Sequence, residues 1–425
     1  MKNYFKMIDW KSGTTKIVAG VCAGVIAIGA GLGLYFGLRT PRSQQLRIMN
    51  WGDYIDEEIF SSFEKYYMDV TGKKINVVYK TFEDSEEAER EITKRKKDYD
   101  LICPSDYVIE RLYNTGKLLP FNFSEVFERT AIEGAVYTDN ITNKLDKAID
   151  DWTEIMENAG GVRYAVPYMY GTNGIMYDRT KVDAAYINNS WAMLWNPNVS
   201  VSMKFTGRDS LAAATLYDNR DILKTLTKEE REIKLKELLN DPSEAMVESA
   251  KTRIKSMNIV AVDEDLVKDD MIKGSGPDAG LFWSCDAGFA MSENTDLEYF
   301  VPQEGSNIWV DGFVMPKYAK NTDAAHWFLN FICREDIAYL NMKASGACSP
   351  VKSARTLIRN DYSADDAKTM SETPKPFPTV AYQAMYVEAC FPTATTLDRC
   401  VKFRAFKTES LIKKVNKLMD KIMAD

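Results

Sequence analysis

The sequence predicts an α/β protein of two domains, preceded by one N-terminal transmembrane helix. Strand-like and helix-like segments alternate from residue 46 onward, which is typical of a parallel sheet covered by helices on both faces. A chain of 425 residues is too long for a single compact core. A run of apolar residues near the N-terminus is long enough to cross a bilayer as a helix.

The apolar run covers residues 17–38 and contains no charged side chain. Four lysines precede it and two arginines follow it closely, so the positive-inside rule places the N-terminus in the cytoplasm. A cleaved signal peptide is the main alternative, but the run exceeds a usual signal core and no clear small-x-small cleavage site follows it. We therefore expect residues 1–42 to form a cytoplasmic N-terminus and membrane anchor, with the remaining body outside the cytoplasm, in the periplasm or at the cell surface.

The body of the chain after the anchor is acidic. Residues 1–42 hold six of the 54 Lys and Arg but only one of the 62 Asp and Glu. An acidic body argues against nucleic acid as a partner and is compatible with a cationic ligand, although such a balance often serves solubility alone.

Histidine, which many enzymes and metal sites need, occurs only once. The only histidine, His326, lies in an apolar helix-like stretch and is best explained as a packed helix residue. Serine triads, histidine bases and most catalytic zinc sites need a placed imidazole, so we predict neither an enzyme nor a metal site. Seven cysteines occur without metal-binding spacing, and Cys390 and Cys400 could form a disulfide or stay as buried thiols.

The first series of elements consists of two strand–helix units followed by a third strand and helix. Short apolar runs indicate the strands, and apolar residues at helical spacing indicate the helices between them. The predicted strands are residues 46–51, 75–82 and 98–105, and the predicted helices are residues 56–67, closed by Gly72, then 85–97, and one that starts at Tyr107. The ligand crevice of such a sheet lies at the carboxyl ends of its strands, where residues 51–54 and 105–107 fall.

A segment at residues 162–179 carries two strand-like runs with a Tyr-Gly break, as expected for extended chain that passes between domains. Beyond this segment the strand-into-helix pattern repeats. The further predicted strands fall in residues 201–205, 279–291 and 298–316, and the further predicted helices in residues 208–217, 227–256 and 403–425. A membrane-surface role is an alternative for the last helix, but packing on its own domain explains its amphipathic pattern more simply.

Aromatic and acidic residues occur together at four predicted strand ends. The groups are Trp51-Gly52-Asp53-Tyr54, Ser105-Asp106-Tyr107, Trp283-Ser284-Cys285-Asp286 and Trp309-Val310-Asp311. An alkyl diamine presents an ammonium at each end and methylenes between, so its receptor needs carboxylates for the charges and aromatic faces for the stem. One such group alone is also explained by a core aromatic beside a helix-capping Asp, so the prediction depends on the repetition.

The order of these groups resembles the spermidine/putrescine-binding proteins of bacterial polyamine ABC importers. The similarity extends over most of residues 46–350, and its most specific stretch is PQEGSNIWVDGFVMPKYAKN at residues 302–321. The resemblance implies the two-lobed fold of type II periplasmic binding proteins, with two crossover strands and the ligand between the lobes. It also implies a polyamine ligand and an ABC permease with its ATPase as partners, and no cofactor.

Carried over onto this sequence, the resemblance implies a binding site that both lobes share. The implied ligand-binding residues are Trp51, Tyr54, Ser105 and Tyr107 from lobe 1, Asp209, Trp283, Trp309 and Asp311 from lobe 2, and Asp53 and Asp286 as candidate partners of a shorter diamine. Lobe 1 is expected to comprise residues 43–165 and 312–365, and lobe 2 residues 166–311 and 366–425.

Three positions depart from the family pattern. Thr206 stands where many spermidine binders have an acid, Ala347 where the family commonly has a tyrosine, and Gly52 where a hydroxyl side chain is usual. These changes are compatible with general polyamine recognition and leave the choice between putrescine and spermidine open.

Three alternative functions fit parts of the same pattern. A receptor for another cationic solute, such as a cationic amino acid or an opine, would use the same cleft with different spacing. A glycosidase would need a catalytic pair among Asp53, Asp209 and Asp311, but nothing in their spacing singles out a pair. A polyamine-sensing module would pass occupancy to a membrane partner through the anchor rather than feed a transporter.

Overall fold

A computed structural model describes residues 40–146, 149, 160–204, 206–262, 264–361 and 379–424. The transmembrane helix predicted at residues 17–38 lies outside these described residues. Within them, no helix combines the length and the apolar character that crossing a membrane requires.

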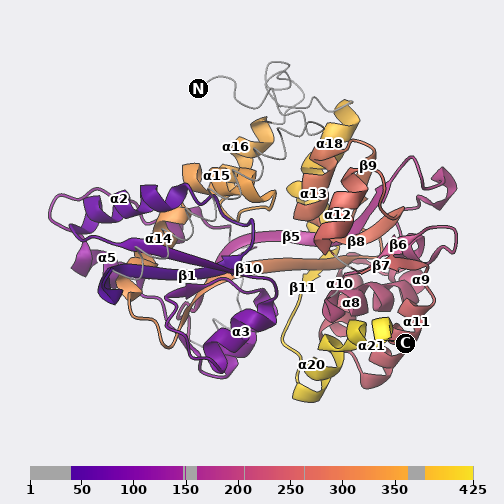
Figure 1. The fold of residues 1–425 in the computed structure, drawn as a ribbon, viewed down its shortest axis with the longest axis horizontal. Helices are drawn as coiled ribbons and strands as arrows, with labels where there is room; N and C mark the ends of the chain where they lie inside the picture. The colour runs from indigo at the N-terminus through magenta and orange to yellow at the C-terminus, as the bar shows by residue number, and fades with distance from the viewer. Residues whose placement is uncertain are drawn as a thin grey trace, which may run out of the picture.

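One mixed sheet runs through the molecule (Figure 1). Its strands are β1 (Gln45–Trp51), β2 (Asn76–Phe82), β3 (Leu101–Ile102), β4 (Leu118–Leu119), β5 (Ala165–Asp178), β6 (Val201–Ser202), β7 (Ile259–Ala261), β8 (Ala279–Trp283), β9 (Leu297–Phe300), β10 (Ser306–Pro316) and β11 (Cys400–Lys402). The order is β2-β1-β3-β10-β5-β8-β6-β7, and β4 and β11 also pair with β10, and β9 with β5. β1 is parallel to β2 and β3, and β6 is parallel to β7 and β8, whereas β5 and β10 are antiparallel to each other.

Helices cover the sheet in two groups. They are α2 (Ile59–Thr71), α3 (Ser85–Thr93), α4 (Asp106–Asn114), α5 (Phe123–Thr130), α6 (Asn140–Lys144), α8 (Gly207–Asp218), α9 (Arg220–Leu223), α10 (Lys228–Asn240), α11 (Glu244–Lys255), α12 (Glu264–Ile272), α13 (Ser284–Glu293), α14 (Thr322–Ile332), α15 (Glu335–Ser345), α16 (Lys352–Asp361), α18 (Val380–Cys390), α19 (Ala394–Leu397), α20 (Glu409–Asn416) and α21 (Leu418–Ala424), with short 3-10 turns η1 (Arg42–Gln44), η2 (Ala184–Tyr186) and η3 (Trp191–Trp195). We call the end with β1–β3, α2–α5 and α14 lobe 1, and the end with β6–β9, α8–α13, α20 and α21 lobe 2 (Figure 1).

The elements predicted for lobe 1 are confirmed, with shifted ends. α2 stops at the predicted residue, because Gly72 has a φ of 67° and its N–H donates to the Met68 carbonyl at 2.8 Å. Glycine adopts this left-handed conformation without steric strain, so it ends the helix before β2 begins. α2 also buries Ile59, Phe63 and Tyr67, which is the face that the helical spacing predicts.

The predicted break at the Tyr-Gly pair is wrong, because residues 165–178 form one continuous strand, β5. A Cβ at Gly171 would lie 2.3 Å from a ring carbon of Trp309 and 2.5 Å from Ser284 Oγ. Close packing therefore requires glycine at this position, and no turn is involved.

Two other segments differ from the prediction in lobe 2. Residues 284–293 form helix α13 directly after β8, where a strand was predicted to continue. α13 approaches α18 so closely that a Cβ at Gly288 would lie 2.2 Å from Cys390 Sγ, and the small residues that allow this approach weaken a helical pattern in the sequence. The C-terminal helix is shorter than predicted and divides into α20 and α21, which pack on α8 and α11 of their own lobe.

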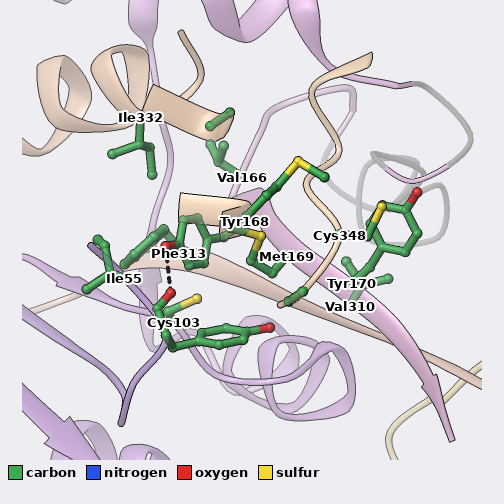
Figure 2. Packing of buried hydrophobic residues seen from close by; sticks show 14 of the residues in the cluster. Ile55, Cys103, Val166, Tyr168, Met169, Tyr170, Val310, Phe313, Ile332 and Cys348 are labelled. Atoms are coloured by element: carbon green, nitrogen blue, oxygen red, sulfur yellow. Dashed lines mark hydrogen bonds between the residues drawn. The ribbon is translucent and has the colours of Figure 1, made fainter. Parts of the chain in front are cut away.

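β5 and β10 cross between the lobes side by side (Figure 1). Every residue of both strands is buried, so side chains on both faces of the sheet are packed here. Figure 2 shows Tyr168 of β5 beside Phe313 of β10, with ring centroids 5.0 Å apart. Packing on both faces holds the two strands firmly, so side chains that they carry between the lobes have fixed positions.

Candidate functional site

Strand ends meet near the middle of the sheet. β1 ends at Trp51, and Ser105 follows β3 as the residue before α4. Ser105 also forms an isolated antiparallel bridge with Asp311 of β10. Because β1 and β3 are parallel neighbours, the residues that follow them lie at the same edge, next to Asp311.

The carboxylate of Asp311 accepts two hydrogen bonds from lobe 1. Tyr54 Oη donates to Oδ2 at 2.9 Å, and Ser105 Oγ donates to Oδ1 at 2.7 Å. Asp311 is only 6% exposed, and burial raises its pKa to about 7, although the two hydroxyl donors oppose the shift. Among the described residues, no cation forms an ion pair with this carboxylate. The ionised form therefore needs a positive partner from outside the chain.

Tyr54, which donates to Asp311, belongs to a cluster of aromatic rings. The Tyr54 ring lies 6.5 Å from Trp309 and 5.7 Å from Tyr168, measured between ring centroids. Tyr168 Oη donates to the Tyr54 carbonyl at 2.8 Å, which fixes the backbone that carries Tyr54. Burial raises the pKa of Tyr54 well above its usual range, so its hydroxyl stays a neutral donor to Asp311.

One tryptophan from each lobe meets the other edge to face. Trp51 of lobe 1 and Trp283 of lobe 2 have ring centroids 6.0 Å apart at an interplanar angle of 73°. The ring of Phe82, at the end of β2, packs against the Trp51 ring, with centroids 4.7 Å apart. Aromatic surface from both lobes is thus brought to one place, as the groups at Trp51 and Trp283 predict, whereas the group at residues 309–311 lies inside β10 and not at a strand end.

Asp209 of α8 is held by neutral donors. Asn173 Nδ2 donates to Oδ1 at 2.7 Å, and Thr206 Oγ1 donates to Oδ2 at 2.7 Å. Trp283 Nε1 donates to Oδ2 at 3.3 Å, so the carboxylate touches the tryptophan at the lobe interface. Asp209 is 7% exposed and, within the described part of the chain, forms no ion pair.

Asp286, by contrast, has lysine partners within the protein. Lys268 Nζ lies 3.2 Å from Oδ1, and Lys204 Nζ lies 3.9 Å from Oδ2. Lys204 Nζ also lies 3.3 Å from the centroid of the Trp283 ring. Sequence reasoning missed Lys204, and the one available signal was a lysine within the otherwise apolar strand end VSMKF.

Two predicted binding residues lie apart from these carboxylates. The Tyr107 hydroxyl lies 3.4 Å from Glu86, and its ring packs on the Arg208 guanidinium at 4.6 Å. Asp53 is exposed, has a φ of 49°, and forms no hydrogen bond or ion pair with another described residue. The ligand-binding roles of Tyr107 and Asp53 stay predictions.

The three departures from the family pattern have different surroundings. Thr206 supplies a hydroxyl donor to Asp209 and no additional carboxylate. Ala347 is 1% exposed, whereas a Cβ at Gly52 would meet no atom within 4 Å. Only Thr206 thus acts directly on a predicted binding residue.

A cluster of buried side chains around Arg208, next to Tyr107, was not predicted. The Arg208 guanidinium carbon lies 4.2 Å from the centroid of the Phe403 ring and 4.1 Å from that of the Phe406 ring. Tyr107 of lobe 1 and these two rings of lobe 2 therefore enclose the guanidinium. Burial lowers the pKa of Arg208 to about 10. Burial also raises the pKa of Asp106 to about 8, and the nearby Arg208 charge opposes this shift.

An ion pair beside this cluster connects the lobes. Arg404, in the segment after β11, donates to both carboxylate oxygens of Glu110 on α4, at 2.9 and 2.7 Å. The Ala405 N–H donates to the same carboxylate at 2.7 Å. Three hydrogen bonds to one carboxylate make this the most direct polar link between α4 of lobe 1 and the C-terminal segment of lobe 2.

The surroundings of His326, Cys390 and Cys400 test the predictions made for these residues. His326 is 3% exposed on α14, its Nε2 accepts from the Asn122 N–H at 3.0 Å, and burial lowers its pKa. This confirms a packed helix residue. Cys390 and Cys400 are not joined in a disulfide, and burial raises the pKa of each thiol to about 12. No cluster of His, Cys, Asp or Glu able to hold a metal occurs among the residues that the structure describes.

Known proteins with similar sequences are solute receptors. The spermidine/putrescine-binding periplasmic protein of Salmonella typhimurium is 26% identical over 361 residues, which cover 83% of this chain and 90% of that protein. The putrescine-binding periplasmic protein of Escherichia coli K12 is 27% identical over 345 residues, which cover 78% of this chain and 86% of that protein. These relatives support a solute-binding protein and not an enzyme, as predicted.

The fold is also similar to a solved structure. The spermidine/putrescine ABC transporter substrate-binding protein of Streptococcus pneumoniae superposes with a TM-score of 0.63 at 25% identity, covering 90% of this chain and 99% of that one. This confirms the predicted two-lobed α/β fold. A family model described as bacterial extracellular solute-binding protein matches residues 58–372, which is more than half of the chain. The chain therefore belongs to the family of bacterial extracellular solute-binding proteins.

Proposed function

We propose that this chain is the extracytoplasmic substrate-binding component of a polyamine ABC importer, which holds putrescine or spermidine between its lobes and delivers it to the permease. The observation that carries this proposal is the Asp311 carboxylate, which is 6% exposed and has hydroxyl donors but no cation from the described chain. An ammonium group of the ligand supplies the missing charge.

The surroundings of Asp311 fit the rest of an alkyl polyamine. Tyr54 and Trp309 offer ring surface beside the carboxylate, and Trp51 and Trp283 offer further rings at the lobe interface. Methylene groups bury their apolar surface against such rings, and ammonium groups are attracted to the ring faces. Asp209 provides a second carboxylate with neutral donors only, next to Trp283.

The relatives support the same ligand class and the same transport role. The two curated proteins reported above bind spermidine and putrescine, or putrescine, and both are periplasmic. The partners that follow for this chain are a polyamine, an ABC permease and its ATPase, with no nucleic acid. Domain closure about β5 and β10 would bury the ligand before docking on the permease.

We further propose the arrangement of the chain at the membrane and its division into lobes. Residues 17–38 would anchor the protein, with the body in the periplasm or at the cell surface, because this charge-free run has the length of a membrane span. Lobe 1 would comprise residues 43–165 and 312–365, and lobe 2 residues 166–311 and 366–425. The positions of α18, which packs on α13, and of α20, which packs on α8, are in keeping with this division.

Calorimetric titration of the full-length chain in mild detergent with putrescine and spermidine tests the ligand class. Binding in the micromolar range or tighter at moderate salt is the expected result. A cationic amino acid, titrated in parallel, tests the alternative of a receptor for another cationic solute. No heat with either polyamine, together with binding of the amino acid, would exclude the proposal. A sensory module would bind polyamines but fail to stimulate transport by the permease in proteoliposomes.

A further inference from the structure

We propose that Lys204 fills one ammonium position of the cleft from within the chain, so that the cleft selects diamines such as putrescine over triamines such as spermidine. This inference rests on the proposed function, since it takes the carboxylates and rings described above as the ligand site. Lys204 is then a specificity-determining residue. It narrows the proposed ligand from polyamines in general to diamines.

Lys204 lies where a ligand ammonium would be attracted. Its Nζ is 3.3 Å from the centroid of the Trp283 ring and 3.9 Å from Asp286 Oδ2. A ring face and a carboxylate are the two partners that an alkylammonium group prefers. A second ammonium cannot use the same face of the same ring, because the two positive charges would repel at contact distance.

The structure holds Lys204 in this place. The residue is 1% exposed and follows β6, and Ser210 Oγ of α8 donates to its carbonyl at 2.9 Å. A buried ammonium is stable only where it keeps a carboxylate or another strong partner. A ligand that pushed Lys204 off Trp283 and Asp286 would leave that charge inside the protein, so a ligand that leaves the lysine in place binds more favourably.

The charges of the three acids give the ligand class. Asp311 and Asp209 accept hydrogen bonds only from neutral donors among the described residues. Asp286 has Lys268 and Lys204 beside it. Of these three buried or half-buried acids, two carboxylates therefore remain for the ligand, which matches the two ammonium groups of a diamine. The third ammonium of a triamine would find its place occupied by Lys204.

The test replaces Lys204 and uses Lys268 as the matched control. Lys204→Met keeps most of the side-chain length and removes the ammonium. Lys268→Met removes the other lysine near Asp286, whose Nζ lies 3.2 Å from Oδ1. The Lys268 Nζ lies 5.8 Å from the centroid of the Phe289 ring, and not over Trp283 as Lys204 does. Calorimetric titration of the full-length wild type and both variants with putrescine and spermidine gives the affinity ratio for each protein.

The wild type and Lys268→Met are expected to bind putrescine at least about tenfold more tightly than spermidine. Lys204→Met is expected to gain about tenfold or more in spermidine affinity, the usual contribution of one charge-assisted contact, with a smaller change for putrescine. If thermal unfolding shows that Lys204→Met is poorly folded, Lys204→Gln, which keeps a polar end without charge, is expected to shift the ratio in the same direction.

The outcomes separate this inference from the proposed function. A wild type that prefers spermidine, or an unchanged spermidine-to-putrescine ratio in well-folded Lys204→Met and Lys204→Gln, overturns the role of Lys204 and leaves the polyamine receptor standing. A wild type that binds neither polyamine overturns the proposed function, and the inference with it.

Discussion

Replacement of Asp311 by asparagine is expected to stabilise the ligand-free protein at pH 8 while it removes polyamine binding. Burial raises the pKa of Asp311 from its ordinary value of 3.8 to about 7, so deprotonation costs more in the folded chain than in the unfolded chain. In this pH range the unfolded state binds fewer protons than the folded state. The folded state therefore loses stability as the pH rises from about 4 to about 7, and the loss is complete above that range.

The size of the effect follows from the same pKa values. A rise from 3.8 to about 7 corresponds to about 4 kcal/mol of unfolding free energy at pH 8. Asparagine gives up one of the two hydrogen bonds, because its amide nitrogen cannot accept from Tyr54 or Ser105, and this costs about 1–2 kcal/mol. The net gain expected for Asp311→Asn is about 2–3 kcal/mol at pH 8 and close to zero at pH 5, where the wild-type carboxyl is largely protonated when folded.

Urea unfolding of the ligand-free wild type and variant at pH 5 and pH 8 measures this difference. Asp296→Asn is a suitable control, because Asp296 is half exposed in a surface pair with Arg179 and should change stability by less than about 1 kcal/mol at either pH. Calorimetry at pH 8 follows polyamine binding in parallel. A variant that is less stable than the wild type at pH 8, or that binds with unchanged affinity, would refute the assignment of Asp311.

Three further changes test other parts of the structure. Polyamine affinity should fall by up to about tenfold per pH unit below pH 7, since protonated Asp311 cannot pair with an ammonium, and titrations from pH 5 to 8 that show a flat profile would contradict this. Arg404→Met should speed ligand dissociation by about three- to tenfold, because it removes the partly exposed pair with Glu110 that joins the lobes, and stopped-flow rates equal to the wild type would show that this pair does not help to hold the ligand. Gly171→Ala should cost about 3 kcal/mol or more of unfolding free energy, because its Cβ would lie 2.3 Å from the Trp309 ring, and an unfolding midpoint equal to that of the wild type would show that the ring can move.

Local signals were enough to predict most elements of lobe 1. The apolar spacing of α2 and the glycine that ends it are properties of neighbouring residues, and the sequence displays them directly. Gly171 was misread because the same residue type serves turns and close contacts. The side-chain size at this position is limited by the ring of Trp309, a residue of β10 that lies far along the chain.

Part of the site could be predicted from residues at strand ends, whereas Asp311 lies within β10 and Asp209 on α8. Trp51 ends β1, Tyr54 lies shortly after it, and Ser105 lies between β3 and α4, and parallel pairing brings such positions together. Lys204 gave no comparable signal, because its role depends on its contact with Trp283 across a tertiary interface. The apolar strand end at residues 201–205 marks this lysine as unusual, but only its neighbours show what it contacts.

Ligand charge and lobe closure are coupled through Asp311. In this structure the ring centroids of Trp51 and Trp283 lie 6.0 Å apart and Glu110 is joined to Arg404, and both contacts hold the lobes together without a ligand. The same arrangement keeps the ionised Asp311 away from water with hydroxyl donors alone, which disfavours closure above pH 7. An ammonium group at Asp311 removes that penalty and shifts the equilibrium toward the closed form, whereas an uncharged ligand of the same shape would not. The buried acid thus makes closure depend on the charge of the ligand, and the aromatic rings make it depend on the apolar stem.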